Sequence, residues 1–207
     1  MDRLTRLIAS TVLVLGACGA SYLVARGTRK PFSVEAPEHR GKGAADAKIV
    51  IVEFSDFECP ACRVAQAPLK NILTHYQGKV RLVYKHFPFE RMHRWARPAA
   101  VAAECAGRQG HFWPFHDMLY ERQDKWVGEQ CEQVLADFAA ELKLDEAAWN
   151  ECRKNADVNA AIDADSADGK NAWVGATPTF FINGKRFVGG HNLAERGVPH
   201  IDKELKK

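Results

Sequence analysis

An α/β fold with an inserted all-helical subdomain is predicted by three features of this 207-residue sequence. The first is the run Cys59-Pro60-Ala61-Cys62, which follows an apolar segment typical of a buried strand. The second is the step Thr177-Pro178, which leads into another apolar segment. The third is the stretch between them, about residues 92–172, where apolar residues recur at helical spacing. A cysteine pair at a strand-to-helix turn, with the distant Thr-Pro step, suggests a thioredoxin-like fold and thiol–disulfide exchange.

The composition is that of a globular protein with one domain, an insertion and additions at the ends. Hydrophobic residues make up 46% of the chain, which is enough for a substantial core. Charged residues make up 27%, but the formal net charge is only +3. Because nucleic-acid-binding proteins carry a polybasic signature, no nucleic acid partner is predicted.

Residues 1–25 are predicted to be a signal sequence or membrane anchor. A short basic head precedes an uncharged, mostly apolar run from Leu7 to Ala25, whose length lies between a signal-peptide core and a full membrane span. Three alternatives are open: the segment is cleaved, it remains as a signal anchor, or Cys18 in Leu15-Gly16-Ala17-Cys18 becomes a lipidated N-terminus. Each exports the following domain to a bacterial periplasm or cell surface, where disulfides persist.

Residues 26–47 are rich in Gly, Pro, Lys and Glu and are predicted to be a linker to a domain at residues 48–207. That domain starts with a buried strand at residues 48–54. A helix follows over residues 60–76, with proline in its first turn and an apolar stripe at helical spacing. The next strand is predicted at residues 80–87. The two strands of such a strand–helix–strand unit should be parallel.

The helical pattern from about residue 92 to 172 is too long for a simple crossover and predicts an inserted helical subdomain. Its successive helix candidates are residues 95–106, 112–123, 129–142, 146–155 and 158–173. After the insertion, short strands at residues 179–182 and 186–188 flank Asn183-Gly184, a strong signal for a two-residue hairpin turn. Residues 191–206 can form a final helix.

The cysteine pair has the placement needed for redox chemistry. Cys59 precedes the helix, where unpaired backbone N–H groups and the helix dipole stabilise a thiolate. Pro60 has no N–H, so the later amides must supply this stabilisation. Cys62, one turn further on, is predicted to be the buried resolving thiol. A zinc site would need a second Cys or His pair at suitable spacing, and the sequence has no other CxxC and no HxxxH, so neither a metal nor a cofactor is predicted.

Two further residues are candidates for the site. Glu53 interrupts the apolar strand six residues before Cys59. It is either a buried carboxylate that relays a proton for the thiols or a strand-end residue that reaches solvent. Pro178 is either a cis-proline that aims the Thr177 backbone at the cysteine pair, where it pairs with a bound peptide, or a trans-proline that starts an edge strand.

Several segments together resemble the DsbA-like family of thioredoxin-fold proteins. They are the runs Val52-Glu53-Phe54-Ser55-Asp56-Phe57-Glu58-Cys59-Pro60-Ala61-Cys62, Gly175-Ala176-Thr177-Pro178-Thr179-Phe180-Phe181-Ile182-Asn183-Gly184, Tyr84-Lys85-His86-Phe87-Pro88, Ala103-Glu104-Cys105-Ala106 and Gly110-His111-Phe112-Trp113. The resemblance covers about residues 47–206. It implies a thioredoxin fold with a helical insertion, Cys59 as nucleophile, Cys62 as resolving thiol, Pro178 as the cis-proline and Glu53 as a buried acid.

The sequence departs from this family at Ala61, where oxidases often carry histidine. Loss of an imidazole there removes one stabiliser of the thiolate and predicts a milder oxidant. Thr177, before the proline, also occurs in isomerases and reductases of the wider family. Pro60, Ala61 and Thr177 are predicted to contact substrate. The linker is too short for the added domain through which isomerases dimerise, so a monomer is expected.

Three cysteines remain after Cys18 and the active pair are set aside. Either one bridge forms, for example between Cys105 and Cys152, leaving Cys131 free, or all three are buried as reduced thiols.

These observations predict an exported thiol:disulfide oxidoreductase that introduces disulfides into cysteine-containing exported proteins. A membrane redox partner would reset the cysteine pair. A disulfide reductase or isomerase of the same fold is the first alternative. A non-catalytic metal- or peptide-binding module is the second.

Overall fold

The computed structural model describes residues 32–207, of which Ser33–Lys207 form one compact unit. The expected signal sequence or anchor, residues 1–25, lies outside the described residues. From residue 32 onward, no helix combines the length and the apolar character needed to cross a membrane.

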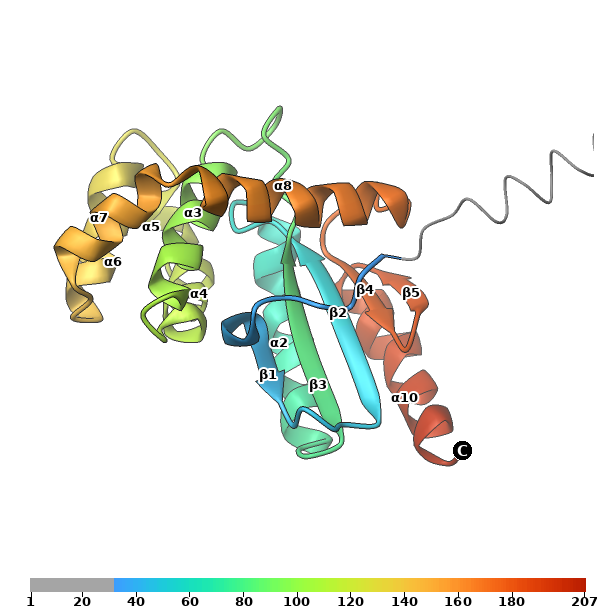
Figure 1. The fold of residues 1–207 in the computed structure, drawn as a ribbon. Coiled ribbons are helices and arrows are strands. Elements are labelled where there is room, and N and C mark those ends of the chain that lie inside the picture. The colour runs from blue at the N-terminus through green and yellow to red at the C-terminus, as the bar shows by residue number, and fades with distance from the viewer. Residues whose placement is uncertain (1–31) are drawn as a thin grey trace, which may run out of the picture. The chain divides into compact units, whose positions relative to one another are not determined.

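A five-stranded mixed sheet forms the centre of this unit (Figure 1). Strand β2 (Ile49–Ser55) lies in the middle, between β3 (Val80–His86) and β4 (Thr179–Ile182). Strands β1 (Gly41–Gly43) and β5 (Lys185–Val188) form the two edges. The β2–β3 pair is parallel, as predicted, and the other pairs are antiparallel. The fold is therefore the predicted thioredoxin-like α/β fold.

The turn between β4 and β5 has the predicted two-residue form. Asn183 has φ of 45° and Gly184 has φ of 83°, and both values lie in the left-handed region. Asn and Gly adopt this conformation at little cost, and it matches the twist of the two flanking strands.

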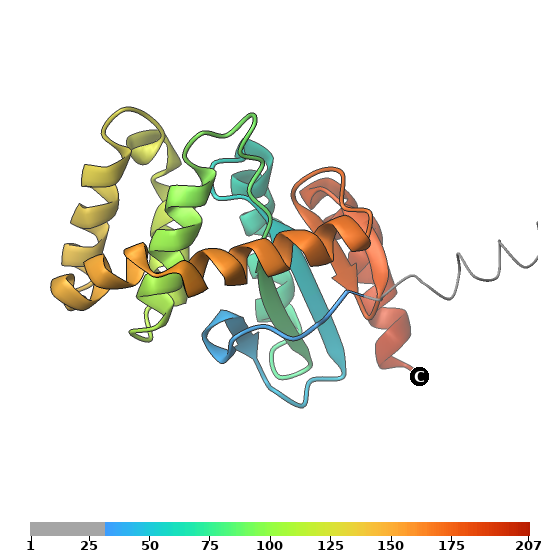
Figure 2. The same cartoon turned by 45° about the horizontal axis from the view of Figure 1, so that its top comes forward.

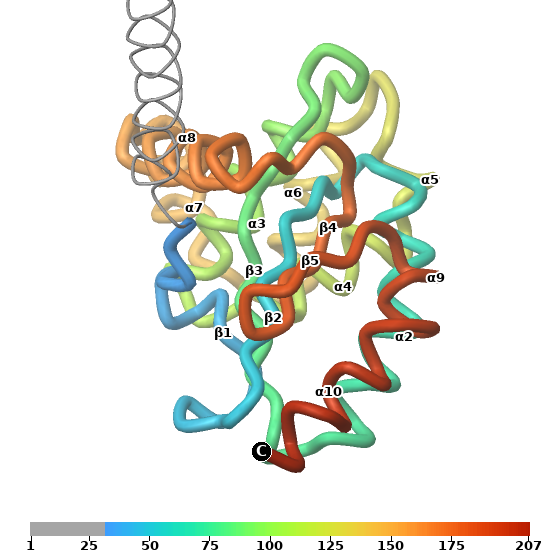
Figure 3. The backbone as a smooth tube through the Cα atoms, turned by 90° about the vertical axis from the view of Figure 1, so that its right-hand side faces the viewer, coloured from blue at the N-terminus to red at the C-terminus, as the bar shows by residue number. Residues whose placement is uncertain are grey.

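Helices cover both faces of the sheet (Figure 3). Helix α2 (Pro60–His75) packs on one face, and α10 (Val198–Leu205) lies beside it. A short helix α9 (Gly190–Asn192) and a π-helical turn η2 (Leu193–Gly197) lead into α10. The long helix α8 (Ala156–Asn171) crosses the opposite face (Figure 2). 

The approach of α8 to the sheet depends on a glycine. A Cβ added to Gly169 would lie 2.4 Å from the Phe87 ring and 3.1 Å from the Phe54 ring. Any larger residue at this position would therefore push α8 away from the sheet.

The predicted helical insertion is confirmed, and it includes a short helix that the sequence did not separate. Its helices before α8 are α3 (Ala96–Gly107), α4 (Phe112–Glu121), α5 (Gln123–Trp126), α6 (Cys131–Glu141) and α7 (Glu146–Lys154). Phe115, Leu135 and Trp149 are buried in their shared core. A disulfide joins Cys105 in α3 to Cys152 in α7, while Cys131 is a buried free thiol. The first alternative for these three cysteines is therefore the one observed.

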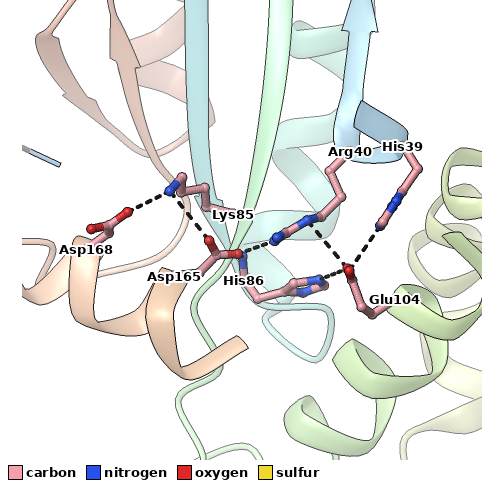
Figure 4. Close-up of polar contacts among 7 residues, drawn as sticks. All are labelled: His39, Arg40, Lys85, His86, Glu104, Asp165 and Asp168. Carbon is pink, nitrogen blue, oxygen red and sulfur yellow. Dashed lines mark hydrogen bonds and ion pairs between the residues drawn. The ribbon is translucent and has the colours of Figure 1, made fainter. Parts of the chain in front are cut away.

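Part of the predicted linker, residues 26–47, belongs to the fold, which corrects that interpretation. Residues Glu38–Arg40 form a 3₁₀ turn, η1, and β1 then pairs with β3. Arg40 is buried and forms ion pairs with Glu104 in α3 and Asp165 in α8 (Figure 4). The Gly- and Pro-rich composition predicted a linker because it indicates local flexibility. It carries no information about the ion pairs that Arg40 forms with residues far away in the sequence.

Candidate functional site

The cysteine pair lies at the N-terminus of α2. Cys59 is the N-cap residue and Pro60 is in the first turn, where its missing N–H removes no helical hydrogen bond. The amides of Cys62 and Arg63 donate to the Cys59 carbonyl at 3.1 and 3.2 Å and begin the helix. Cys59 retains 8% exposure whereas Cys62 is fully buried, so only Cys59 can meet a second protein.

The two thiols have opposite electrostatic environments. The pKa of Cys59 is lowered to about 5, first by a hydrogen bond from the Cys62 thiol and further by Thr177 and the amides of Cys62 and Ala61. Burial raises the pKa of Cys62 well above its usual range, and the adjacent Cys59 charge raises it further. Cys59 is therefore a thiolate at neutral pH while Cys62 remains protonated.

The Thr177–Pro178 peptide bond is cis, the first of the two alternatives. The Cys59 Sγ lies 3.6 Å from the Thr177 carbonyl oxygen. The loop is held by two hydrogen bonds: Thr179 Oγ1 donates to the Ala176 carbonyl at 2.7 Å, and the Gly189 amide donates to the Pro178 carbonyl at 2.8 Å. The structure thus brings Thr177 and Pro178 to the cysteine pair, as predicted.

Glu53 is a buried acid, not a strand-end residue that reaches solvent. Side chains alternate along β2, so Glu53 lies on the same face as Ile51, which packs under α2. The Gln66 side chain in α2 donates to Glu53 Oε1 at 3.2 Å and also to the Cys62 carbonyl at 3.2 Å. Burial raises the pKa of Glu53 to about 7, although hydrogen bonds from Ser55 and Gln66 lower it in part.

The raised pKa of Glu53 makes stability depend on pH. Glu53 contributes fully to the free energy of unfolding below pH 4.5, its pKa in the unfolded chain. This contribution is lost as the pH rises through about 7, its pKa in the folded protein. Glutamine does not titrate, so the Glu53→Gln variant should not lose this stability as the pH rises. It is therefore expected to gain about 3 kcal/mol of unfolding free energy relative to the parent between about pH 4.5 and pH 8.

Urea unfolding of the oxidised proteins measures this difference, since the oxidised pair does not titrate. Glu151→Gln, an exposed site on α7, is the matched control and should show no such trend. Parallel pH profiles for Glu53→Gln and the parent would contradict a raised pKa for Glu53.

The loop before the cysteine pair is held by residues that the sequence did not single out. The buried Asp56 carboxylate accepts hydrogen bonds from the amides of Glu58 and Phe89, both at 2.8 Å. Gln123 donates to the carbonyls of Phe57 and Cys59 at 2.7 and 3.2 Å. Because Gln123 lies in the helical insertion, the insertion fixes the position of the nucleophile.

A group of hydroxyls lies beneath Cys62. Ser55 Oγ and the Tyr120 hydroxyl are 2.9 Å apart, and the Tyr84 hydroxyl is 3.3 Å from that of Tyr120. Ser55 also lowers the pKa of both Cys62 and Glu53 through hydrogen bonding. Ser55 stands two residues after Glu53 within the strand motif, a signal that sequence reasoning could have used, whereas nothing local marks Tyr120.

The different environments of the free thiols predict selective modification. Burial raises the pKa of Cys131 to about 12. Brief treatment of the native, reduced protein with iodoacetamide is expected to label Cys59 but neither Cys62 nor Cys131. The labelling rate should reach half its maximum at a pH near the Cys59 pKa of about 5.

Peptide mass spectrometry locates the label, and denatured protein is the control in which Cys62 and Cys131 must also react. Labelling of native Cys131 at a rate near that of Cys59 would contradict its burial.

No group of three or more His, Cys, Asp or Glu residues suited to a metal ion occurs within residues 32–207.

Comparisons with known proteins agree with this geometry. Residues 35–198 match the protein family described as Thioredoxin. Oxidised BdbD from Bacillus subtilis aligns with a TM-score of 0.73 and 26% identity, over 83% of this chain and 96% of BdbD. Alpha-DsbA1 from Wolbachia pipientis aligns with a TM-score of 0.72 and 22% identity, over 83% of this chain and 93% of alpha-DsbA1, a likeness of fold alone.

Sodium/proton antiporters are among the similar curated proteins. The antiporter NhaA 1 of Salinispora arenicola is 38% identical over 154 residues, which are 73% of this chain and 22% of the antiporter. The antiporter NhaA of Herminiimonas arsenicoxydans is 33% identical over 151 residues, 73% of this chain and 23% of the antiporter. The chain therefore spans less than a quarter of the length of these two relatives, and the match does not transfer their transport activity.

The cysteine pair, the fold around it and these similarities define the class of protein: a thioredoxin-fold protein whose cysteine pair is arranged for thiol–disulfide exchange. The match over residues 35–198 shows that the chain belongs to the thioredoxin family, and its fold is that of the DsbA-like proteins it resembles.

Proposed function

We propose that this protein is an exported oxidase that introduces disulfides into cysteine-containing exported proteins. The lowered pKa of Cys59, about 5, carries the proposal. A stable Cys59 thiolate favours the reduced form of the pair, so the oxidised pair tends to accept electrons from other thiols. The same thiolate is a good leaving group when a substrate is released.

The reaction has two thiolate attacks. A substrate thiolate attacks Cys59 Sγ, the Cys59–Cys62 bond breaks, and Cys62 leaves and takes up a proton. A second substrate thiolate then attacks the substrate sulfur of the mixed disulfide, and Cys59 leaves as a thiolate. The substrate loses two electrons and gains a disulfide, while the protein gains both electrons.

Glu53 is the proposed proton source for Cys62. Its pKa of about 7 leaves a large protonated fraction at neutral pH. Gln66 bonds both the Glu53 carboxyl and the Cys62 carbonyl, which holds the acid near the buried thiol. The role is therefore general acid and base for a sulfur that solvent does not reach.

Exposed apolar side chains near the pair fit an unfolded protein as substrate. Val64, two residues after Cys62, is 72% exposed, and Trp173 is 71% exposed in the segment that leads to the cis-proline. Met92 is 76% exposed in the loop after β3. Pro60, Ala61 and the Thr177 backbone complete the proposed contact surface, on which an extended peptide can pair with Thr177.

The proposal includes a location and a second partner. The domain would act in the periplasm or at the extracytoplasmic face of a bacterial membrane as a monomer. A membrane redox partner would reoxidise Cys59 and Cys62 after each turnover, because the pair ends each cycle reduced. A reductase or isomerase would use the same residues but a partner that supplies electrons.

The reduction potential of the pair tests the direction. Thioredoxin has a nucleophile pKa of about 7 and a potential of about −270 mV. A pKa of about 5 here corresponds to a potential roughly 60 mV higher, about −210 mV. Equilibration with glutathione, with Cys59→Ser as the control, gives the value. A potential at or below that of thioredoxin would favour the reductase.

A further inference from the structure

Cys59 has no charged neighbour within the CxxC run, but a histidine from a distant loop lies at the site. His93 is in the loop between β3 and α3, 34 residues after Cys59. Its Nδ1 lies 2.7 Å from Oδ2 of Asp56. The Cys59 amide donates to the main-chain carbonyl of the same Asp56 at 3.2 Å. Asp56 therefore bonds both the histidine and the nucleophile.

The position of this imidazole is fixed. The Asp56 side chain is fully buried and also accepts from two backbone amides, so it holds His93 through Nδ1–H. The His93 amide donates to the Phe89 carbonyl at 2.9 Å, which anchors the loop itself. The His93 side chain is 17% exposed, so it retains access to protons from solvent.

The charges around His93 favour its protonated form. Burial opposes that form, but the hydrogen bond to Asp56 and the charges of Asp56, Cys59 and Glu58 outweigh it and raise the pKa of His93. Arg94, next in the chain, stacks on the Trp95 ring with its guanidinium carbon 4.7 Å from the ring centroid. Because the interaction between two charges is reciprocal, an imidazolium that the Cys59 thiolate stabilises must stabilise that thiolate in return.

We propose that His93, protonated and held on Asp56, is the cationic partner of the Cys59 thiolate. It is a positioning residue that acts on Cys59 through its charge and takes no part in the covalent steps. The inference rests on the proposed function, in which the Cys59 thiolate is the leaving group. The charge of His93 adds to the hydrogen bond from Cys62 that stabilises the thiolate, at a site where Ala61 offers no imidazole.

The test is the rate of iodoacetamide reaction at Cys59 near pH 5, where the thiolate fraction is most sensitive to nearby charge. His93→Gln retains an N–H donor for Asp56 but removes the charge, and it is expected to slow the reaction about threefold. His93→Lys restores a positive charge and is expected to recover most of the rate. His200→Gln, in α10 with its imidazole 4.0 Å from Glu204, is the matched control and should react like the parent.

A measurement on the unaltered sequence completes the test. Blocking Cys59 with iodoacetamide removes the thiolate, so the pKa of His93, followed by NMR, should fall relative to the reduced protein. Equal rates for His93→Gln and the parent, or an equal loss in His93→Lys, would overturn the proposal. An unchanged His93 pKa after blocking would overturn it as well. Failure of the parent to exchange disulfides at all would instead contradict the proposed function.

Discussion

The Cys62→Ser variant is expected to accumulate as mixed disulfides through Cys59. In this variant the Cys59 thiolate forms the mixed disulfide by attacking a disulfide of a substrate protein, whose second sulfur leaves as a thiolate. Cys62 is the thiol that α2 places at the nucleophile, and a serine hydroxyl in its place cannot attack the mixed disulfide to release the substrate. The oxidised pair cannot form in this variant. Turnover should therefore fall on the order of a thousandfold or more, because nucleophile and resolving thiol act as a unit. Non-reducing electrophoresis after expression in a bacterium, followed by mass spectrometry, detects and identifies the trapped proteins.

Two variants make this experiment specific. Cys59→Ser should trap nothing, since the remaining Cys62 is fully buried. Cys131→Ser removes a free buried thiol from α6 and should leave turnover unchanged. Trapping through Cys62 in the Cys59→Ser variant would reverse the assignment of the two roles. Equal trapping in the parent and in Cys62→Ser would show that Cys62 does not resolve the intermediate.

The parts of the fold that the sequence predicted well are those set by local chemistry. The strand at residues 49–55, the proline at the start of α2 and the Asn183-Gly184 turn each follow from neighbouring residues. The helical insertion was also predictable, since each of its longer helices carries its own apolar stripe. The nucleophile could be named for the same reason: strand, cysteine pair and helix are contiguous.

The parts that escaped prediction depend on residues distant in sequence. Gln123 contacts the cysteine loop across more than sixty positions, and His93 reaches it through Asp56. Neither residue belongs to a recurring pattern, so only the folded chain reveals their roles. The choice between one bridge, such as Cys105–Cys152, and three reduced thiols was open for the same reason, because a disulfide needs proximity that spacing alone does not give.

Arg40 is the clearest example of such a long-range contact. It comes from the segment before β1 and lies at the centre of a buried ionic network (Figure 4). Arg40 pairs with Glu104 and Asp165, while Lys85 pairs with Asp165 at 3.5 Å. The network also includes His86 and His39, whose imidazoles lie 3.4 and 3.0 Å from Glu104. It joins the sheet, the helical insertion and α8.

Removal of Arg40 is expected to have a large effect on stability. Its side chain is only 2% exposed, so Arg40→Met leaves two buried carboxylates, Glu104 and Asp165, with less compensation. Breaking a buried pair in this way costs about 3–5 kcal/mol. Lys85 and the His86 amide still contact Asp165 in this variant. The expected loss of unfolding free energy is therefore near the lower end of that range, about 3 kcal/mol. Thermal unfolding of the oxidised protein should shift down by roughly 10 °C.

Arg97→Met is the matched control, because Arg97 also pairs with two carboxylates, Glu90 and Asp163, but near the surface. Both partners are about half exposed or more, so solvent screens the pairs and the loss should stay below about 1 kcal/mol. Equal losses in the two arginine variants would show that burial of Arg40 adds nothing. A loss confined to Arg40→Met would establish that residues before β1 belong to the stable domain, and that a domain boundary at residue 48 removes a structural part of the oxidoreductase.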